Sequence, residues 1–180
     1  MSDRDLIARV LDGDTKTFGQ LVQRYQKLIY RLAYAYVGNH DDADDLVQSI
    51  FLRAYDKLSS FRGESAFKTW LYRIGVNHCL NHLAKSQRRR EQQLESIPEI
   101  ASSDPTPLDT FSRKWKEEVI RQAIPQLPEK QQKVVILRAV EGFTYREIAE
   151  ILDCPVETAK TNYHYGVKTL RRLIFGEKGE

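Results

Sequence analysis

The 180-residue sequence contains only two cysteines, Cys79 and Cys154. Two thiols cannot form a disulfide framework, which excludes the small disulfide-rich scaffolds and suits a reducing compartment. No run approaches the roughly 18 to 20 apolar residues that a membrane-spanning helix needs. The N-terminus also lacks the basic-then-apolar layout of a secretory signal peptide. We therefore expect a cytoplasmic protein without membrane insertion.

Signatures of catalysis are also missing, since there is no Gly-rich phosphate loop, nucleophile elbow or paired-carboxylate motif. The nearest approach to a metal site is His78, Cys79 and His82, because histidines four residues apart can share a metal ion. No carboxylate or second Cys–His cluster follows them, so ordinary helix packing is the favoured interpretation. The sequence predicts a protein that is not an enzyme and that needs no metal and no cofactor.

The formal net charge is only +3, but the charges are unevenly distributed. Four aspartates are bunched between positions 41 and 45, whereas residues 62–90 carry seven basic side chains against one acid. Residues 158–175 carry four basic side chains and no acid. One acidic and two basic surfaces, far apart in the sequence, indicate three separate contacts.

Residues 86–111 are predicted to be a flexible linker. They contain three prolines, four serines and the arginine triplet Arg88–Arg90, and they show no sustained apolar period. Ordering such a stretch would bury too little surface to offset the entropy that it loses. The linker separates an N-terminal domain of residues 1–85 from a C-terminal domain of residues 112–180.

Apolar residues in the N-terminal domain recur at the three-and-four spacing of amphipathic helices, without the alternation that is typical of strands. One helix is expected from near Asp14 to Gly38, and a second over residues 43–58. A third is expected to begin after Gly63 and to end near Lys85. This domain is therefore predicted to be a helical bundle.

The C-terminal domain is predicted to have shorter helices, over residues 112–124 and 128–142. Thr144 and Glu147 then form a capping box that opens the next helix. A break at residues 153–155 leads to a final helix that ends near Phe175. This is the layout of a helix-turn-helix DNA reader. The chain is thus predicted to be all-α, with two small helical domains joined by a flexible linker.

The final helix is expected to turn an apolar face to the preceding helices and a polar face to DNA. Residues early in such a helix reach base edges in the major groove, so we expect Glu157 to accept from a cytosine amine and Thr161 to meet a thymine methyl. Later residues are better placed for phosphates; these are Lys168, Arg171 and Arg172. The alternative is a plain solvated face. One such module buries only about 600–1,000 Å², so specific binding needs a second reading element.

The third helix of the N-terminal domain offers that second element. One stripe of this helix is apolar and suits the core, whereas the opposite stripe combines Trp70 and Ile74 with Asn77 and Asn81. Unstacked bases need apolar surface for their faces and amides for their edges, so this mixture indicates single-stranded nucleic acid. Phe61 is placed to help. The alternative is that Trp70 and Ile74 pack on the N-terminal helix, with the asparagines as exposed filler.

Three long motifs, in the right order, carry a family resemblance. They are DADDLVQSIFLRAYDKL, SFRGESAFKTWLYRIGVNHCLNHL and LPEKQQKVVILRAVEGFTYREIAEILDCPVETAKTNYHYGVKTLRRL. Together they resemble an extracytoplasmic-function (ECF) sigma factor of the sigma-70 family. The resemblance implies two helical domains that load onto bacterial RNA polymerase core and direct it to promoter DNA. It implies a transcription initiation factor, without enzyme activity of its own, that is commonly held inactive by an anti-sigma factor.

The resemblance also implies roles for particular residues. The family positions that dock on the clamp helices of the polymerase's largest subunit match Asp45, Gln48, Leu52 and Arg53. The positions that hold flipped bases of the minus-ten element match Phe61, Ile74, Asn77 and Asn81, with Arg73 and Lys85 as backbone contacts. The positions that read the minus-thirty-five element match Glu157, Thr158, Lys160, Thr161 and His164. Ser49 and Asn162 depart from the usual glutamate and the usual basic residue, so the promoter sequence does not transfer.

The resemblance gives the linker a physical meaning. Its 26 residues span about 28 Å as a random coil. Two promoter elements that are about 17 base pairs apart lie some 58 Å from each other at 3.4 Å per step. A free chain would seldom present both readers at that separation, so core polymerase should be required for promoter selection. The competing hypothesis is a stand-alone helix-turn-helix regulator, which leaves the Asp45–Gln48 surface and the Trp70–Asn81 stripe without a role.

Overall fold

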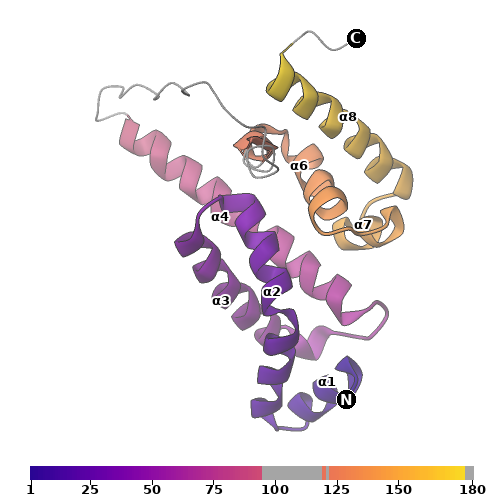
Figure 1. Cartoon of the computed structure of the whole chain (residues 1–180). Coiled ribbons are helices and arrows are strands. Elements are labelled where there is room, and N and C mark those ends of the chain that lie inside the picture. Colours follow the sequence, from indigo (N-terminus) through magenta and orange to yellow (C-terminus); the bar gives the residue numbers. More distant parts are fainter. Residues whose placement is uncertain (95–118, 121, 177–180) are drawn as a thin grey trace, which may run out of the picture.

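The computed structural model describes residues 1–94, 119–120 and 122–176, with the backbone alone for residues 90–94. Over these residues the chain is helical and has no strand (Figure 1), which confirms the predicted all-α fold. The N-terminal half consists of α1 (Asp3–Leu11), α2 (Phe18–Val37), α3 (His40–Asp56) and α4 (Phe67–Leu94). The described part of the C-terminal half contains α6 (Glu129–Val135), α7 (Tyr145–Leu152) and α8 (Val156–Phe175). Shorter helical turns are η1 (Thr15–Thr17), η2 (Leu58–Ser60), η3 (Ile124–Gln126) and the π-type turn η4 (Ile136–Val140).

Helix α1 is an element that the apolar spacing did not predict. It begins with a capping box, in which the Ser2 hydroxyl accepts from the Asp5 N–H at 3.2 Å and the Asp5 carboxylate accepts from the Ser2 N–H at 2.8 Å. Leu6, Ile7 and Val10 are buried against the bundle. A Ser-x-x-Asp signal before apolar residues at helical spacing was available in the sequence.

The predicted stop at Gly38 is confirmed, but the helix expected over residues 43–58 begins earlier, at His40, and ends at Asp56. Helix α2 ends at Gly38, whose φ of +73° is the left-handed conformation that glycine adopts without steric cost. Helix α3 follows almost at once, because the Asn39 side chain caps it by accepting from the Asp42 N–H at 2.9 Å. Asp41 and Asp42 lie in the first turn of α3, where a negative charge suits the helix dipole.

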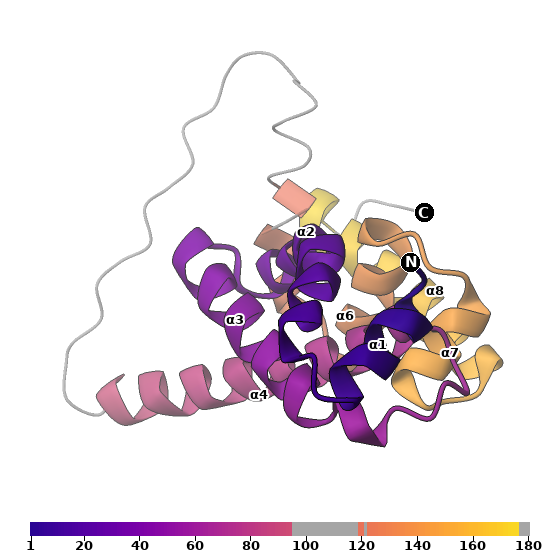
Figure 2. The ribbon, with the colours of Figure 1, turned by 90° about the horizontal axis from the view of Figure 1, so that it is seen from below.

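Helix α4 packs across α2 and α3 through its apolar stripe. Tyr72, Val76 and Cys79 are buried there, as expected. Gly75 lets the helices approach closely, since a Cβ at that position would lie 2.8 Å from Cδ2 of Leu32. The helix continues to Leu94 instead of ending near Lys85, and Figures 1 and 2 show its C-terminal end projecting beyond α2 and α3.

The longer α4 changes the expected linker. Residues 86–94, which were expected to begin the linker, are helical. Residues 95–111 of the expected linker lie outside the described residues, and so does most of the helix that was expected over 112–124. The apolar period that ends near Leu83 marks the end of packing and not the end of the helix, because a helix can run on into solvent with polar residues on every side.

The C-terminal half follows the predicted order. The chain is helical from Glu129 to Val140 and turns at Gly142, whose φ is +74°. The predicted capping box opens α7, with the Thr144 N–H donating to the Glu147 carboxylate at 2.7 Å. Asp153, with a φ of +50°, makes the left-handed turn into α8. Helices α7 and α8 therefore form the predicted helix-turn-helix.

The two halves are in contact with each other. Helix α4 packs against α7, and α2 lies against η3 and η4 (Figure 2). The ring of Tyr72 meets the ring of Phe143 edge-on, with centroids 4.7 Å apart. Both side chains are almost fully buried, so residues that are distant in the sequence share one apolar contact across the two halves.

Candidate nucleic-acid interface

A hollow of about 430 Å³ lies between α3, η2 and α4. Its volume falls in the range of ligand pockets, roughly 300–1,000 Å³. The lining residues are Arg53, Lys57, Ser60, Trp70, Arg73, Ile74, Asn77, His78 and Asn81. Most of the residues predicted for single-stranded DNA thus come together on one wall, because α4 carries them at helical spacing. The opposite wall comes from α3 and η2.

Trp70, which lines the hollow, belongs to a cluster of tilted aromatic rings. Trp70 lies 5.3 Å from Phe61 and 5.5 Å from Phe67, measured between ring centroids. Phe67 is buried, whereas Phe61, Trp70 and Ile74 are half-buried. Trp70 and Ile74 pack against the core and also line the hollow.

The polar side chains of the hollow combine amides with cations. Asn77 and Asn81 are exposed, and no described carboxylate lines the hollow. Arg53 reaches across from α3 and places Nη1 3.3 Å from Nδ1 of His78. Burial, followed by the charge of Arg53, lowers the pKa of His78. In the neutral imidazole that this favours, Nδ1 accepts the hydrogen bond from Arg53, and the Nε2–H group is left as a donor.

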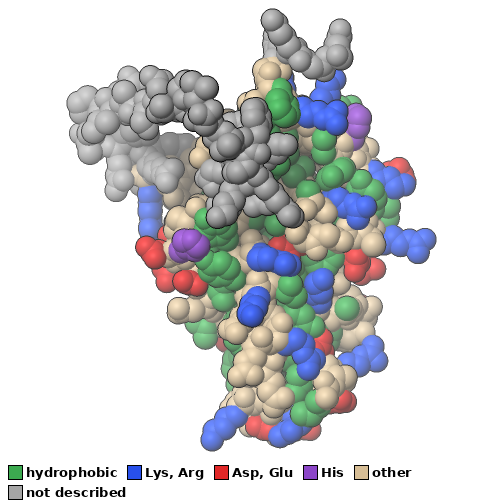
Figure 3. All heavy atoms as spheres, viewed as in Figure 1, with side chains coloured by type: hydrophobic (Ala, Val, Ile, Leu, Met, Phe, Trp, Pro, Cys, Tyr) green, Lys and Arg blue, Asp and Glu red, His purple; other side chains and the backbone are tan. Residues whose placement is uncertain are grey.

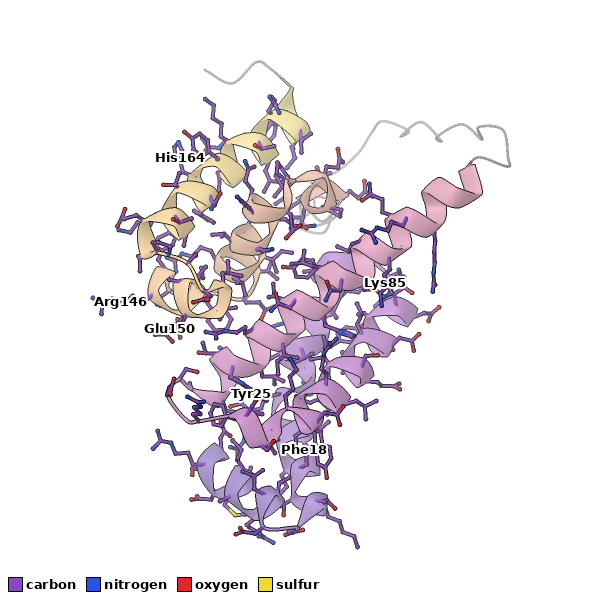
Figure 4. All side chains as sticks on the ribbon, turned by 180° about the vertical axis from the view of Figure 1, so that it is seen from behind. Phe18, Tyr25, Lys85, Arg146, Glu150 and His164 are labelled. Atoms are coloured by element: carbon purple, nitrogen blue, oxygen red, sulfur yellow. The ribbon has the colours of Figure 1, made fainter. Side chains whose placement is uncertain are left out.

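Two of the residues predicted to contact the minus-ten element, Phe61 and Lys85, are not among the lining residues. Lys85 is exposed further along α4, as Figure 4 shows, and does not line the hollow. Arg73 lines the hollow, but its guanidinium donates a hydrogen bond to the main-chain carbonyl of Glu150 in α7. Three lining residues were not predicted to contact DNA, namely Lys57, Ser60 and His78; only their closeness to Phe61 and Asn77 in the chain was a signal.

A second candidate surface is the outer face of α3. Asp45, Gln48 and Leu52 follow one another at spacings of three and four and are exposed. Leu52 is 67% exposed, which is unusual for leucine in the middle of a helix. Arg53 points away from this stripe and into the hollow. The stripe combines an exposed apolar side chain with two polar ones, which is a composition found at protein contacts.

The third candidate surface is the outer face of α8. Its inner face is narrow: Ala159 and Gly166 are buried, and a Cβ on Gly166 would lie 2.6 Å from Cγ2 of Val135. The predicted DNA-reading residues are all exposed: Glu157, Thr158, Lys160, Thr161, His164, Lys168, Arg171 and Arg172. Basic side chains stand out along the edge where α8 lies (Figure 3), and Figure 4 shows His164 directed outward.

The first turn of α8 carries one acidic and one basic side chain, whereas Lys168, Arg171 and Arg172 lie in its C-terminal half. Lys160 Nζ lies 2.7 Å from the Glu157 carboxylate, so the first turn presents a balanced pair. Tyr165 is 53% exposed beside His164, and no pattern in the sequence singled it out.

No described group of three or more His, Cys, Asp or Glu could hold a metal ion. Burial raises the pKa of Cys79 to about 12, so this thiol behaves as a core side chain.

Comparison with known proteins agrees with these surfaces. Residues 21–89 match the family model of sigma-70 region 2, and residues 117–170 match that of sigma-70 region 4. The ECF RNA polymerase sigma-E factor of Haemophilus influenzae is 39% identical over 170 residues, which cover 89% of each chain. This chain belongs to the ECF sigma factors of the sigma-70 family. The sigma-E factor of Escherichia coli K12 is 38% identical over 173 residues, with 89% of this chain and 88% of that one covered.

Solved structures place the fold among sigma factors as well. CnrH, solved with the cytosolic domain of CnrY, superposes with a TM-score of 0.68 at 25% identity and covers 98% of this chain and 99% of that one. The sigma factor RpoE of Bartonella quintana, solved with the anti-sigma factor NepR, gives a TM-score of 0.67 at 24% identity, with 91% and 99% covered. In this sigma factor, region 2 spans α2, α3 and most of α4, and region 4 contains the helix-turn-helix. No described helix has the length and apolarity to cross a membrane.

Proposed function

We propose that this sigma factor binds RNA polymerase core and directs it to promoters with its two halves. Helix α8 reads the duplex minus-thirty-five element, and the hollow on α4 captures bases of the melted minus-ten element. The observation that carries the proposal is the lining of the hollow, where Trp70 and Ile74 lie beside Asn77 and Asn81 without a described carboxylate. Apolar surface, amides and cations together match the faces, edges and phosphates of single-stranded DNA.

The roles divide by position within the hollow. Trp70 and Ile74 supply the apolar surface on which a flipped base stacks, with Phe61 supporting Trp70 from behind. Asn77 and Asn81 hydrogen-bond to base edges. Arg53 and Lys57 on the opposite wall join the predicted backbone contacts Arg73 and Lys85. Arg53 is thus assigned to DNA instead of to polymerase, because it points into the hollow.

The exposed stripe on α3 is the proposed contact for the clamp helices of the polymerase's largest subunit. Leu52 lies at its C-terminal end, with Asp45 and Gln48 on the preceding turns. An exposed leucine costs the free protein little, but its burial on binding contributes roughly 25 cal/mol per Å² of apolar surface. The stripe lies on a different side of α3 from Arg53, so polymerase and minus-ten DNA can be bound together.

A protein partner that holds the chain inactive is also part of the proposed function. Sigma factors of this fold have been solved with the cytosolic domain of CnrY and with the anti-sigma factor NepR. We propose an anti-sigma factor for this chain too, and a place of action in the cytoplasm, where polymerase and promoters are found. The chain selects promoters, and the chemistry of transcription belongs to the polymerase.

The test is run-off transcription by purified core polymerase that lacks its own specificity subunit, on a library of promoter templates. We expect defined start sites only when the purified chain is added, with enriched sequence at two positions about 17 base pairs apart. If the chain alone bound a palindromic duplex and left the start sites random, the stand-alone regulator would replace this proposal.

A further inference from the structure

Three aromatic rings lie together at the turn between α2 and α3. Tyr30 and Tyr34 are one helical turn apart on α2, with ring centroids 6.1 Å apart and ring planes 14° from parallel. Gly38 and Asn39 turn the chain so sharply that His40, the first residue of α3, lies back against them. The His40 ring centroid is 4.9 Å from that of Tyr34 and 6.3 Å from that of Tyr30. We call Tyr30, Tyr34 and His40 the aromatic shelf.

The aromatic shelf is held in place by contacts within the chain itself. The Tyr30 hydroxyl is hydrogen-bonded to Nδ1 of His40. Both tyrosines pack against the core and are half-buried, whereas His40 is exposed. Rings that are already fixed lose little conformational freedom when a partner binds, so a rigid aromatic surface favours binding. None of the three residues lines the hollow on α4, so the shelf is available for a different contact.

Acidic side chains lie beside the aromatic shelf. Asp41, Asp44 and Asp45 are exposed, and none of them forms an ion pair within the described part of the chain. Burial, followed by the charge of Asp44, raises the pKa of Tyr30, which agrees with a carboxylate close to this ring. Lysine and arginine both pair with carboxylates, but the planar guanidinium of arginine also stacks flat on an aromatic ring. Rings with carboxylates beside them therefore fit an arginine side chain.

The aromatic shelf adjoins the exposed stripe on α3. At about 100° per residue, Asp44 lies about 100° to one side of Asp45, and Arg53 lies about 80° to the other side. Arg53 points into the hollow. A partner that covers the stripe can therefore extend its contact toward the shelf without meeting the proposed DNA site.

The stripe alone is small for a stable protein contact. A specific interface covers about 800 Å² on each partner, and even a large aromatic side chain buries only about 150–250 Å². Three side chains of the stripe do not reach that area, so the contact must include neighbouring residues. From His40 to Leu52 the surface runs about 18 Å along α3, which is the length of about twelve residues of a partner helix.

We infer that the aromatic shelf binds an arginine side chain of the protein that covers the α3 stripe. The guanidinium stacks on the rings of the shelf and pairs with the carboxylate of Asp44. The identity of that protein as RNA polymerase rests on the proposed function, but the recognition of arginine does not. Two experiments therefore test the ligand and the partner separately.

The first experiment tests the ligand without polymerase. The full chain carries 3-fluorotyrosine at position 34 alone and is titrated with Nα-acetyl-arginine amide or with Nα-acetyl-lysine amide, which have equal charge. We expect a saturating change of the fluorine shift, with about twofold to fivefold tighter binding of the arginine compound. Asp44→Asn should weaken that binding, whereas Asp12→Asn, exposed at the end of α1, should not. Equal binding of the two amides, or no change of the shift with either, would overturn the recognition of arginine.

The second experiment measures binding to core polymerase. Tyr34→Leu keeps an apolar side chain against the core and removes the ring, and it should weaken binding about threefold to tenfold. His40→Ala leaves the core untouched, because His40 is exposed, and should weaken binding about twofold to fivefold. Asp12→Asn should bind as the natural chain does. Circular dichroism checks that each variant retains its helices.

The outcomes of the second experiment separate two failures. If folded Tyr34→Leu and His40→Ala bound core polymerase as tightly as the natural chain, the shelf would not be part of the contact. Failure of the proposed function would appear differently. The natural chain itself would not bind polymerase, while the arginine compound would still change the fluorine shift at position 34.

Discussion

The two halves of this sigma factor support their DNA-reading helices in different ways. The N-terminal half surrounds α4 with a deep core, in which large side chains such as Tyr36 and Tyr72 are fully buried. The C-terminal half holds α8 by a narrow strip, where Ala159 and Gly166 are the buried residues. A hollow that must fit a flipped base needs two rigid walls, whereas a helix that lies in a major groove needs one supported side. This difference predicts that substitutions in the hollow strongly lower open-complex formation, whereas substitutions on the outer face of α8 lower DNA binding by smaller amounts.

The largest effect is expected from the walls of the hollow. Trp70→Ala should lower open-complex formation about tenfold to a hundredfold, because each base that stacks on an aromatic ring contributes roughly 1–3 kcal/mol. Asn77→Ala should lower it up to about tenfold, because it removes hydrogen bonds to a base edge. Polymerase binding should be unchanged. Run-off transcription and a core-binding assay measure the two quantities, and Gln26→Ala is the control for an amide outside the hollow. An equal loss in core binding would contradict the base-capture role.

A second large effect is expected on the α3 stripe. Leu52→Asp should weaken core polymerase binding at least about tenfold, because it places a charge in an apolar contact that binding buries. Leu11→Asp is the matched control, since Leu11 is 52% exposed at the end of α1 and outside every proposed contact. Both variants should melt at the temperature of the natural chain. If the two weakened polymerase binding equally, the stripe would not be the docking surface.

The two close-packed glycines sharpen the comparison of the halves. Gly166→Ala should lower the free energy of unfolding by about 1–3 kcal/mol, because the new Cβ would meet the stiff β-branched Val135. Gly75→Ala should change it by less than about 1 kcal/mol, because the Leu32 side chain can rotate away and alanine favours the helix. Urea unfolding measures both. A larger loss of unfolding free energy in Gly75→Ala than in Gly166→Ala would show that the packing under α8 adapts more easily than the packing around α4.

A graded effect is expected on the outer face of α8. Lys168→Ala should weaken holoenzyme binding about threefold to fivefold on all promoter sequences and reduce the slope of log K against log salt by roughly one. Thr161→Val should alter base preference and leave that slope unchanged. Competition binding at several salt concentrations separates the two. A change of base preference in Lys168→Ala would contradict its assignment to phosphate.

The smallest effect concerns the capping box of α7. The Thr144 N–H and hydroxyl both donate to Glu147 and lower its pKa below the ordinary value of 4.5. The stabilisation from ionised Glu147 is therefore present above pH 4.5 and is lost as the pH falls through the lowered pKa. Glu147→Gln should cost about 0.5–1 kcal/mol near pH 7 and almost nothing near pH 3. Thermal melts at both pH values test this, and an equal cost at both would contradict it.

The sequence predicted which side chains lie together wherever a single helix carries all of them. The spacing of Trp70, Ile74, Asn77 and Asn81 placed them on one wall because α4 is a regular helix. The opposite wall was not predictable, since Arg53 and Lys57 reach the hollow only through the angle at which α3 packs. The pairing of Arg31 with Glu141, 110 residues apart, has no periodic signal at all. It depends on how the two halves meet.

The end of α4 and the start of α1 were missed for a related reason. The sequence of residues 86–94 has no regular apolar stripe, so apolar spacing could not show that the helix continues. Helix α1 is short, and its capping signal at Ser2 and Asp5 carries the information that spacing does not. Both cases show that apolar periodicity reports packing, whereas helix ends are determined by hydrogen bonds at the termini.

The contact between the two halves depends on the number of residues in the π-type turn at Ile136–Val140. Each residue added to or removed from a helix rotates the downstream chain by about 100°. Deletion of Ala139 would restore ordinary helical winding and turn the carboxylate after it away from α2. Insertions or deletions in this turn would therefore part the halves while every side chain that meets DNA or polymerase stays the same.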